Sequence, residues 1–116
     1  MMPVQTWVFR ARCTRVVDGD TLDVVIDQGM HTQRTERVRL LGVNAPELHG
    51  ATREAGIVAR SWVDAWIVAA GLGTWPLVIQ TYKADVFGRY LATIWRGDKG
   101  EELNASLVTA GMAAPA

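Results

Sequence analysis

The 116-residue sequence has a single cysteine, Cys13, which excludes an internal disulfide. It has no Cys-x-x-Cys motif or Cys/His cluster that would suggest zinc. Cys13 lies in an alternating apolar run, which favours a small core residue over a nucleophile.

Long apolar runs are also missing, and none approaches the length needed to cross a bilayer. The first residues lack both the basic region and the apolar stretch of a signal peptide. We therefore expect a cytoplasmic protein without a membrane partner. Secretion stays open, because an export signal could have been lost.

The sequence has no excess of charge of either sign, since twelve basic residues balance twelve acidic ones. A protein that binds nucleic-acid backbone mainly by counterion release is usually strongly basic, so tight general binding is not expected. Ten of the twelve basic residues are arginine, however, and arginine is the better bidentate phosphate ligand. This composition favours local recognition of individual phosphates.

The residues present fit one globular domain over residues 1–116, with 49% hydrophobic and 21% charged side chains. Alternating patterns predict five short strands, over residues 6–17, 21–26, 36–43, 76–82 and 89–95. Helical spacing predicts a helix over 52–70 and a second helix over 101–110. The first helix would bury the stripe Val58, Trp62, Ala65, Trp66 and Ala69, and the second would end at Gly111.

Short strands compatible with antiparallel pairing close most easily into a small barrel. The predicted fold class is therefore α+β, mainly β: a five-stranded OB-type barrel with two helices, the first of which closes one end. A split sheet with both helices on one face is the alternative.

Three segments place charged residues beside glycine or proline at the ends of these apolar runs. They are Asp18-Gly19-Asp20-Thr21, Arg39-Leu40-Leu41-Gly42-Val43-Asn44-Ala45-Pro46-Glu47, and Asp85-Val86-Phe87-Gly88-Arg89. If the fold brings them together, they form an acidic pocket for a hard cation flanked by two arginines. Such a pocket has the groups needed for metal-assisted phosphodiester cleavage.

Each segment taken alone also has a plainer interpretation. Asp18 can close a hairpin turn by accepting hydrogen bonds from nearby amides. Arg39 shares a face with Leu41 and Val43, which would hold its guanidinium near the barrel interior, and an anion must meet it there. Asp18 or Asp23 could serve as that anion, and so could a substrate phosphate.

At these spacings the chain resembles the staphylococcal nuclease (thermonuclease) family. The resemblance covers Val16 to about Gly111. It rests on the DGDT turn, the RLLGVxxPE strand end, the D-x-x-GR hairpin and a terminal helix reading Leu-Asn-Ala-Ser-Leu-Val-Thr-Ala-Gly. It implies an OB-type five-stranded barrel that uses calcium to cleave DNA and RNA, releasing the 5′-oxygen and leaving 3′-phosphate ends.

The resemblance also implies roles for individual residues. Asp20 would bind the cation directly, and the Asn44 side chain and the Ala45 carbonyl would hold the other protein-ligand positions. Glu47 would orient or deprotonate the attacking water. Arg39 and Arg89 would bind phosphate oxygens, Arg89 nearer the leaving oxygen. Asp85 and Phe87 would contact substrate. Apart from the resemblance, the loop position of His49, two residues after Glu47, would also let it touch substrate.

Two departures from the family pattern carry consequences. Asn44 stands where the family usually has a second metal-binding aspartate, so the site has one negative charge fewer and weaker calcium binding is expected. Val86 and Phe87 replace a lysine and a tyrosine, which would keep base stacking but lose a phosphate contact.

These observations favour a monomeric calcium-dependent endonuclease acting on nucleic acid, with single-stranded DNA or RNA preferred. A catalytically weakened OB-fold module that binds nucleic acid or protein is the alternative. A small interaction domain with accidental charges at its turns would not explain three motifs in order.

Overall fold

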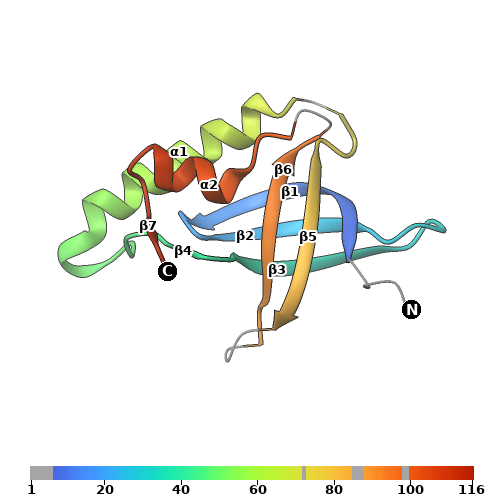
Figure 1. Ribbon diagram of the computed structural model, residues 1–116, viewed down its shortest axis with the longest axis horizontal. Helices are drawn as coiled ribbons and strands as arrows, with labels where there is room; N and C mark the ends of the chain where they lie inside the picture. The colour runs from blue at the N-terminus through green and yellow to red at the C-terminus, as the bar shows by residue number, and fades with distance from the viewer. Residues whose placement is uncertain (1–6, 72, 85–87, 98–99) are drawn as a thin grey trace, which may run out of the picture.

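The computed structural model describes residues 7–71, 73–84, 88–97 and 100–116. Five of its strands close into a barrel in the order β1-β2-β3-β6-β5 (Figure 1). They are β1 (Val8–Asp18), β2 (Thr21–Asp27), β3 (Gln33–Leu40), β5 (Leu77–Ala84) and β6 (Tyr90–Arg96). The predicted OB-type barrel is confirmed, and the split sheet is not found.

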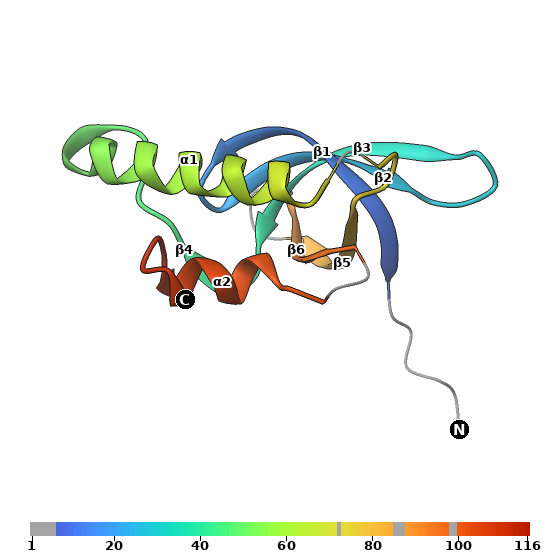
Figure 2. The same cartoon turned by 90° about the horizontal axis from the view of Figure 1, so that it is seen from above.

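Two helices accompany the barrel. A 3₁₀ turn (Gly50–Thr52) leads into α1 (Arg53–Ala69), and α2 (Leu103–Thr109) follows β6. Both helices lie on the same side of the barrel (Figure 2). Gly111 adopts a positive φ of 75° just beyond α2, a backbone conformation that favours glycine and ends the helix as predicted. No helix among the described residues is both long enough and apolar enough to span a bilayer.

The barrel closes through a pair of strands that local pattern did not reveal. Four of its five strand pairs are antiparallel, but β3 and β6 run parallel, with Val38 opposite Tyr90. A parallel pair cannot be joined by a tight turn. The long connection through α1 and β5 brings β6 back beside β3, so one strand pair in the ring joins segments about half the chain apart.

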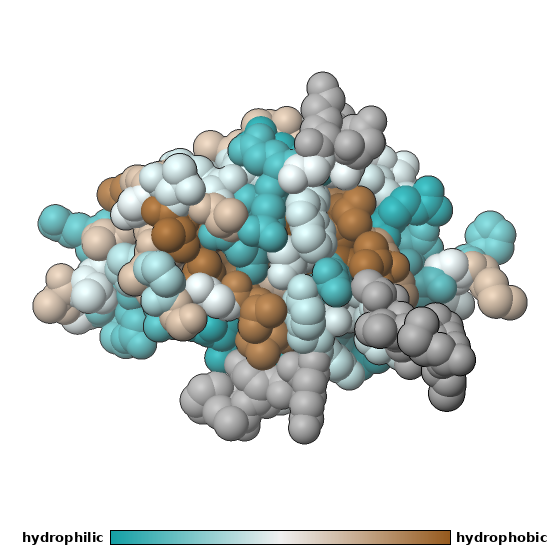
Figure 3. Space-filling model, viewed as in Figure 1, coloured by the Kyte–Doolittle hydropathy of each residue, from teal (hydrophilic) through white to brown (hydrophobic). Residues whose placement is uncertain are grey.

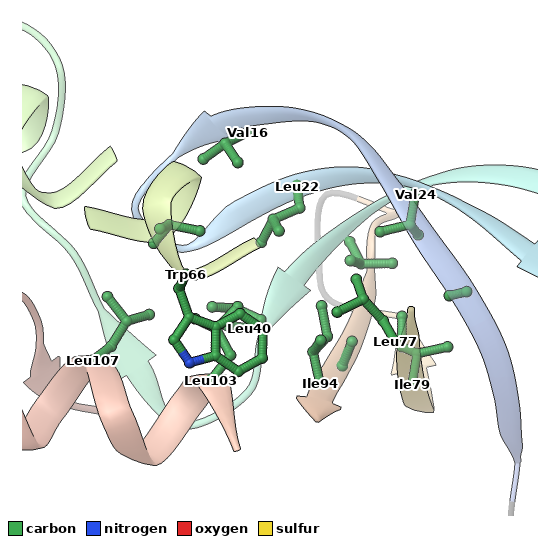
Figure 4. Close-up of a cluster of buried hydrophobic side chains, with 14 of the residues drawn as sticks. Val16, Leu22, Val24, Leu40, Trp66, Leu77, Ile79, Ile94, Leu103 and Leu107 are labelled. Carbon is green, nitrogen blue, oxygen red and sulfur yellow. The ribbon is translucent and has the colours of Figure 1, made fainter. Parts of the chain in front are cut away.

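The core lies inside the barrel and continues between the barrel and the helices (Figure 4). Leu22, Leu40, Leu77 and Ile94 fill the interior, and all four are fully buried. Trp66 of α1 and Leu103 and Leu107 of α2 join the same cluster. On the face seen in Figure 3, apolar side chains form small patches separated by hydrophilic ones.

The predicted third strand was too long at its C-terminal end. Strand β3 stops at Leu40 because Gly42 adopts a positive φ of 79° and the chain turns there. Val43 and Asn44 then form a separate short strand, β4 (Val43–Asn44), which pairs with β7 (Ala114–Pro115). The backbone of Asn44 thus pairs with Ala114 of β7 rather than with a strand of the barrel.

The predicted helix is present and Trp66 of its predicted stripe is buried, but the rest of that stripe was wrong. The buried residues of α1 are Gly56, Ala59, Val63 and Trp66, whereas Val58 is 54% exposed. Trp62 is only partly buried against the core. The small residues at 56 and 59 carry little hydrophobic signal, yet they let α1 approach the barrel closely.

Strand β1 keeps its predicted alternation only as far as Cys13. A register shift between Cys13 and Arg15 inserts one extra residue, so Ala11 and Val16 are both buried although they are five positions apart. Cys13 is half-buried against the core, and burial raises the pKa of its thiol to about 11. The thiol is therefore protonated at neutral pH, as the predicted packing role requires.

Candidate active site

The fold brings the first two motifs and Arg89 to one cavity of about 430 Å³. From the predicted set, Asp20, Arg39, Asn44, Ala45, Glu47 and Arg89 all line it, together with Asp18, Thr21 and Pro46. The two remaining predicted site residues, Asp85 and Phe87, lie outside the described residues. Segments far apart in the sequence therefore share one hollow on the outside of the barrel.

Asp20 lies at the floor of this cavity, with its side chain 13% exposed. Its Oδ1 accepts a hydrogen bond from the Thr21 hydroxyl at 3.1 Å. Its Oδ2 accepts from the Ala45 backbone N–H at 2.9 Å and from Arg39 Nη2 at 3.4 Å. The carboxylate is thus fixed from three directions and ties the first motif to the second.

Arg39 joins Asp20 to Asn44, because the same Nη2 also donates to the Asn44 amide oxygen. The predicted position near the barrel interior was wrong. Val38 and Leu40 face the interior and are fully buried, while the Arg39 side chain is 21% exposed on the opposite face. The turn at Gly42 breaks the alternation that had placed Arg39 with Val43.

The observed carboxylate partner of Arg39 is Asp20, rather than the candidates Asp18 and Asp23. Asp23 instead forms a two-point ion pair with Arg37, at 2.8 and 3.2 Å. The hydrogen bonds from Arg37 lower the pKa of Asp23 below its ordinary value. Arg39 therefore keeps its guanidinium for the groups of the cavity.

Asp18 closes the turn as predicted, since its Oδ1 accepts from the Asp20 backbone N–H at 3.1 Å. Burial, and then the adjacent Asp20 carboxylate, raise the pKa of Asp18 to about 6. Two carboxyl groups this close resist carrying two charges. A cationic group in the cavity would relieve that repulsion.

Glu47 reaches the rim of the cavity with its side chain 72% exposed. Its carboxylate lies 3.0 Å from His49 Nε2, a partner that the sequence did not reveal. Its backbone is held more firmly than its side chain, because the Thr52 hydroxyl donates to the Glu47 carbonyl at 2.9 Å. The side chain can therefore swing while its attachment point stays in place.

Helix α1 packs closely against the turn at Gly19 and against the Pro46–Glu47 loop. It does so through small residues, which did not suggest a role in the site. A Cβ added at Gly56 would lie 2.4 Å from the Glu47 carbonyl oxygen. A Cβ added at Gly19, between the two aspartates, would lie 2.7 Å from Ala45 Cβ and 2.9 Å from Ala59 Cβ. The one signal in the sequence was a glycine inside a predicted helix, where glycine costs about 1 kcal/mol relative to alanine.

The donors available to a metal ion are mostly neutral. Among the described residues, no three carboxylate, imidazole or thiolate groups gather so as to hold a metal. A cation would depend on Asp20 with the amide oxygen of Asn44 and the carbonyl of Ala45, all at the lining of the cavity. These are the hard oxygen donors that calcium takes, so the donor chemistry fits a weakly charged calcium site.

Comparison with known proteins agrees with this geometry. Residues 37–116 match the family model described as staphylococcal nuclease homologue. The chain is 31% identical to Protein ParB of Escherichia coli over 117 aligned residues, covering 90% of this chain and 55% of that protein. It is 32% identical to Thermonuclease of Staphylococcus intermedius over 102 residues, covering 85% of this chain and 55% of that protein. The chain spans about half the length of these curated relatives. It belongs to the staphylococcal nuclease family.

Proposed function

We propose that this chain is a calcium-dependent endonuclease that hydrolyses DNA, and RNA as a second substrate, leaving 3′-phosphate ends. The observation that carries the proposal is the convergence of Asp20, Arg39, Glu47 and Arg89 on one cavity. The family relationship supports it, since one relative is a thermonuclease. Single strands are the favoured substrate, because a chain of zero net charge offers little general attraction to a duplex.

The two arginines would bind the scissile phosphate. A phosphodiester anion repels an incoming hydroxide, so its charge must be offset before attack. Arg39 and Arg89 line the same cavity and can donate to different phosphate oxygens while fixing the phosphorus in line with the water. Asp20, Asn44 and Ala45 would hold calcium, which when bound supplies further positive charge beside the phosphate.

Glu47 would act on the attacking water. Its exposed carboxylate can accept a proton from a water at the cavity rim. The water oxygen then bonds to phosphorus and the bond from phosphorus to the 5′-oxygen breaks. The leaving 5′-oxygen takes a proton from solvent, and Glu47 returns its proton to solvent. The products are a 3′-phosphate and a 5′-hydroxyl.

A binding module without catalysis is the second candidate. Two observations favour it: Asn44 is neutral, and no cluster of three acidic, histidine or cysteine ligands occurs in the described part of the chain. Such a module would use Arg39 and Arg89 to hold phosphate and would leave it uncleaved.

Cleavage of a labelled single-stranded oligonucleotide by the purified chain separates these functions. With calcium present we expect cleavage products whose mass identifies 3′-phosphate ends, and with a calcium chelator we expect none. Binding without cleavage under all conditions would favour the module. Equal cleavage with and without chelator would contradict the metal assignment.

Substitution of Asn44 tests where the metal binds. We expect Asn44→Asp to tighten calcium binding by about tenfold, or ~1.4 kcal/mol, because a carboxylate adds a full charge beside Asp20. This expected gain in calcium affinity already allows for an opposing effect. The new carboxylate would also pair more strongly with Arg39, which contacts residue 44. Titration calorimetry measures the affinity directly.

The matched control is Gln33→Glu, which adds the same charge on an exposed residue of β3. It should leave the calcium affinity unchanged. If Asn44→Asp binds calcium no better than the control, residue 44 does not face the metal.

A further inference from the structure

A second cavity, of about 500 Å³, lies at the other end of the barrel strands. It is lined by the first residues of β1, β3 and β6 and by the last residues of β2 and β5, so it occupies the barrel opening away from α1. Its volume falls in the range of small-molecule sites. None of the residues assigned to the candidate active site lines it.

Aromatic rings dominate its wall. Trp7, Phe9, Tyr82 and Tyr90 all contribute. Trp7 and Phe9 are stacked, with ring centroids 6.5 Å apart and planes 17° apart, and Trp7 is 53% exposed. Flat rings facing an open cavity provide a stacking platform for a planar ligand.

An irregularity in β5 adds the fourth ring. Between Thr81 and Ala84 the register with β6 shifts, which breaks the alternation of the strand. Consecutive residues Thr81 and Tyr82 therefore both line the cavity. The Tyr82 hydroxyl is hydrogen-bonded to the buried Thr93 hydroxyl at 3.2 Å, which fixes the ring.

The cavity lining also contains one charged hydrogen-bond donor, Arg34, and one charged acceptor, Glu36. Arg34 and Glu36 form an ion pair on the same face of β3, and the Arg34 guanidinium lies 5.5 Å from the centre of the Tyr90 ring. The pair leaves the cavity without net charge, which disfavours a free anion or cation. It suits a flat ligand whose edge both donates and accepts hydrogen bonds, as a nucleobase does.

The two cavities share the same pair of strands. Tyr90 follows Arg89 directly in sequence, and Arg89 lines the candidate active site. On β3, Glu36 and Arg39 are about 10 Å apart along the strand but point to opposite faces of the sheet, since Glu36 shares the face of the buried Val38 and Arg39 does not. A single strand that occupies both cavities must therefore pass around the barrel rim beside Arg89 and Tyr90.

We infer that the barrel-end cavity binds an unstacked base of the nucleic-acid strand whose phosphate occupies the Arg39 cavity, with a purine preferred. Trp7 would stack on the base, and Arg34, held over the Tyr90 ring, and Glu36 would contact its polar edge. The assignment of the strand rests on the proposed function. The capacity to bind a base does not depend on cleavage.

An NMR titration of the ¹⁵N-labelled chain with guanosine, cytidine and choline, without divalent cation, tests the cavity. We expect guanosine to shift amide signals of Phe9, Arg34, Glu36 and Tyr90, with weaker shifts from cytidine and none from choline. Trp7→Leu and Glu36→Gln should each weaken guanosine binding by about tenfold, as expected for loss of stacking or edge contacts. Both replace partly exposed side chains, so folding should survive.

Matched controls are Trp75→Leu and Asp27→Asn, which remove an aromatic ring and an ion-paired carboxylate elsewhere on the barrel. Both should bind guanosine like the parent. Absence of guanosine shifts, shifts confined to Arg39 and Glu47, or equal binding of choline would overturn the inference.

Cleavage kinetics connect the cavity to the strand. On a single-stranded oligonucleotide, Trp7→Leu should raise KM about tenfold with kcat retained, and it should leave hydrolysis of a phosphodiester that lacks bases unchanged. An unaltered KM would show that the base of the substrate strand does not enter this cavity. If the chain cleaves nothing, the proposed function fails while the nucleoside titration still decides whether the cavity takes a base.

Discussion

Arg39→Ala is expected to lower cleavage of single-stranded DNA by about a hundredfold to a thousandfold, the loss typical when one preorganised donor to a transition-state anion is removed. Arg39 donates hydrogen bonds to both Asp20 and Asn44, and it lines the cavity with Glu47 and Arg89. Without Arg39, positive charge is missing from the place where a bound phosphate would gain negative charge in the transition state. The measurement is kcat/KM on a labelled oligonucleotide.

Folding should survive this change. Asp20 keeps its hydrogen bonds from Ala45 N–H and the Thr21 hydroxyl, and the Arg39 side chain lies outside the barrel core. Circular dichroism and the midpoint of thermal unfolding verify that point. Glu47→Ala should cause a comparable loss of activity, because a positioned general base contributes about a hundredfold to ten-thousandfold.

Arg37→Ala provides the control for Arg39→Ala. Arg37 lies two residues away on the same strand and the same face, but it is engaged with Asp23 instead of the cavity. It should retain most activity. Equal losses for the two arginines would mean that general positive charge matters rather than a specific contact, and an active Arg39→Ala would refute the catalytic assignment.

Gly56→Ala is expected to destabilise the fold by about 1–3 kcal/mol, the usual cost of overpacking a tight contact. The added methyl would lie 2.4 Å from the Glu47 carbonyl oxygen and 3.0 Å from the Pro46 carbonyl oxygen, both of which are backbone atoms. Either α1 or the Pro46–Glu47 loop must move. Since that loop carries Glu47, activity measured well below the unfolding midpoint should fall as well.

Helix propensity alone predicts the opposite effect of Gly56→Ala on stability. Glycine to alanine within a helix normally stabilises by about 1 kcal/mol. A higher unfolding midpoint for Gly56→Ala would therefore show that α1 does not press on the loop. Gly73→Ala is the matched control, because a Cβ there would meet no heavy atom within 4 Å. It should be neutral or slightly stabilising.

The sequence was sufficient for the type and order of the main elements. Alternation over residues 7–13 and 76–82 reflects burial on one side of a strand, which local pattern records. Helical spacing over 52–70 predicted the helix but not most of its buried face. It was insufficient for the parallel pairing of β3 with β6, because that pairing depends on a long connection and not on either strand's composition. The turn at Gly42, which ends β3 early, is visible only through its positive φ.

The candidate site, too, could be predicted from the sequence only in part. Charged residues next to glycine and proline identified the residues that line the active-site cavity, and the structure places Asp20, Arg39 and Arg89 there. Their roles in binding metal or substrate stay predictions. Which carboxylate meets which arginine depends on register, so the assignment of Asp23 to Arg37 and of Asp20 to Arg39 needed three-dimensional structure. The contact of Gly56 with Glu47 was indicated only by the presence of a glycine inside a predicted helix.

The parallel closure of the barrel has a consequence for how the candidate active site is assembled. Arg89 directly precedes β6, and β6 pairs with β3 across a connection of about half the chain. Contacts between residues so distant in sequence form slowly during folding. A chain whose ring has not closed would hold Asp20 and Arg39 without Arg89 beside them, so the cavity that carries the proposed hydrolysis is complete only when the ring is complete.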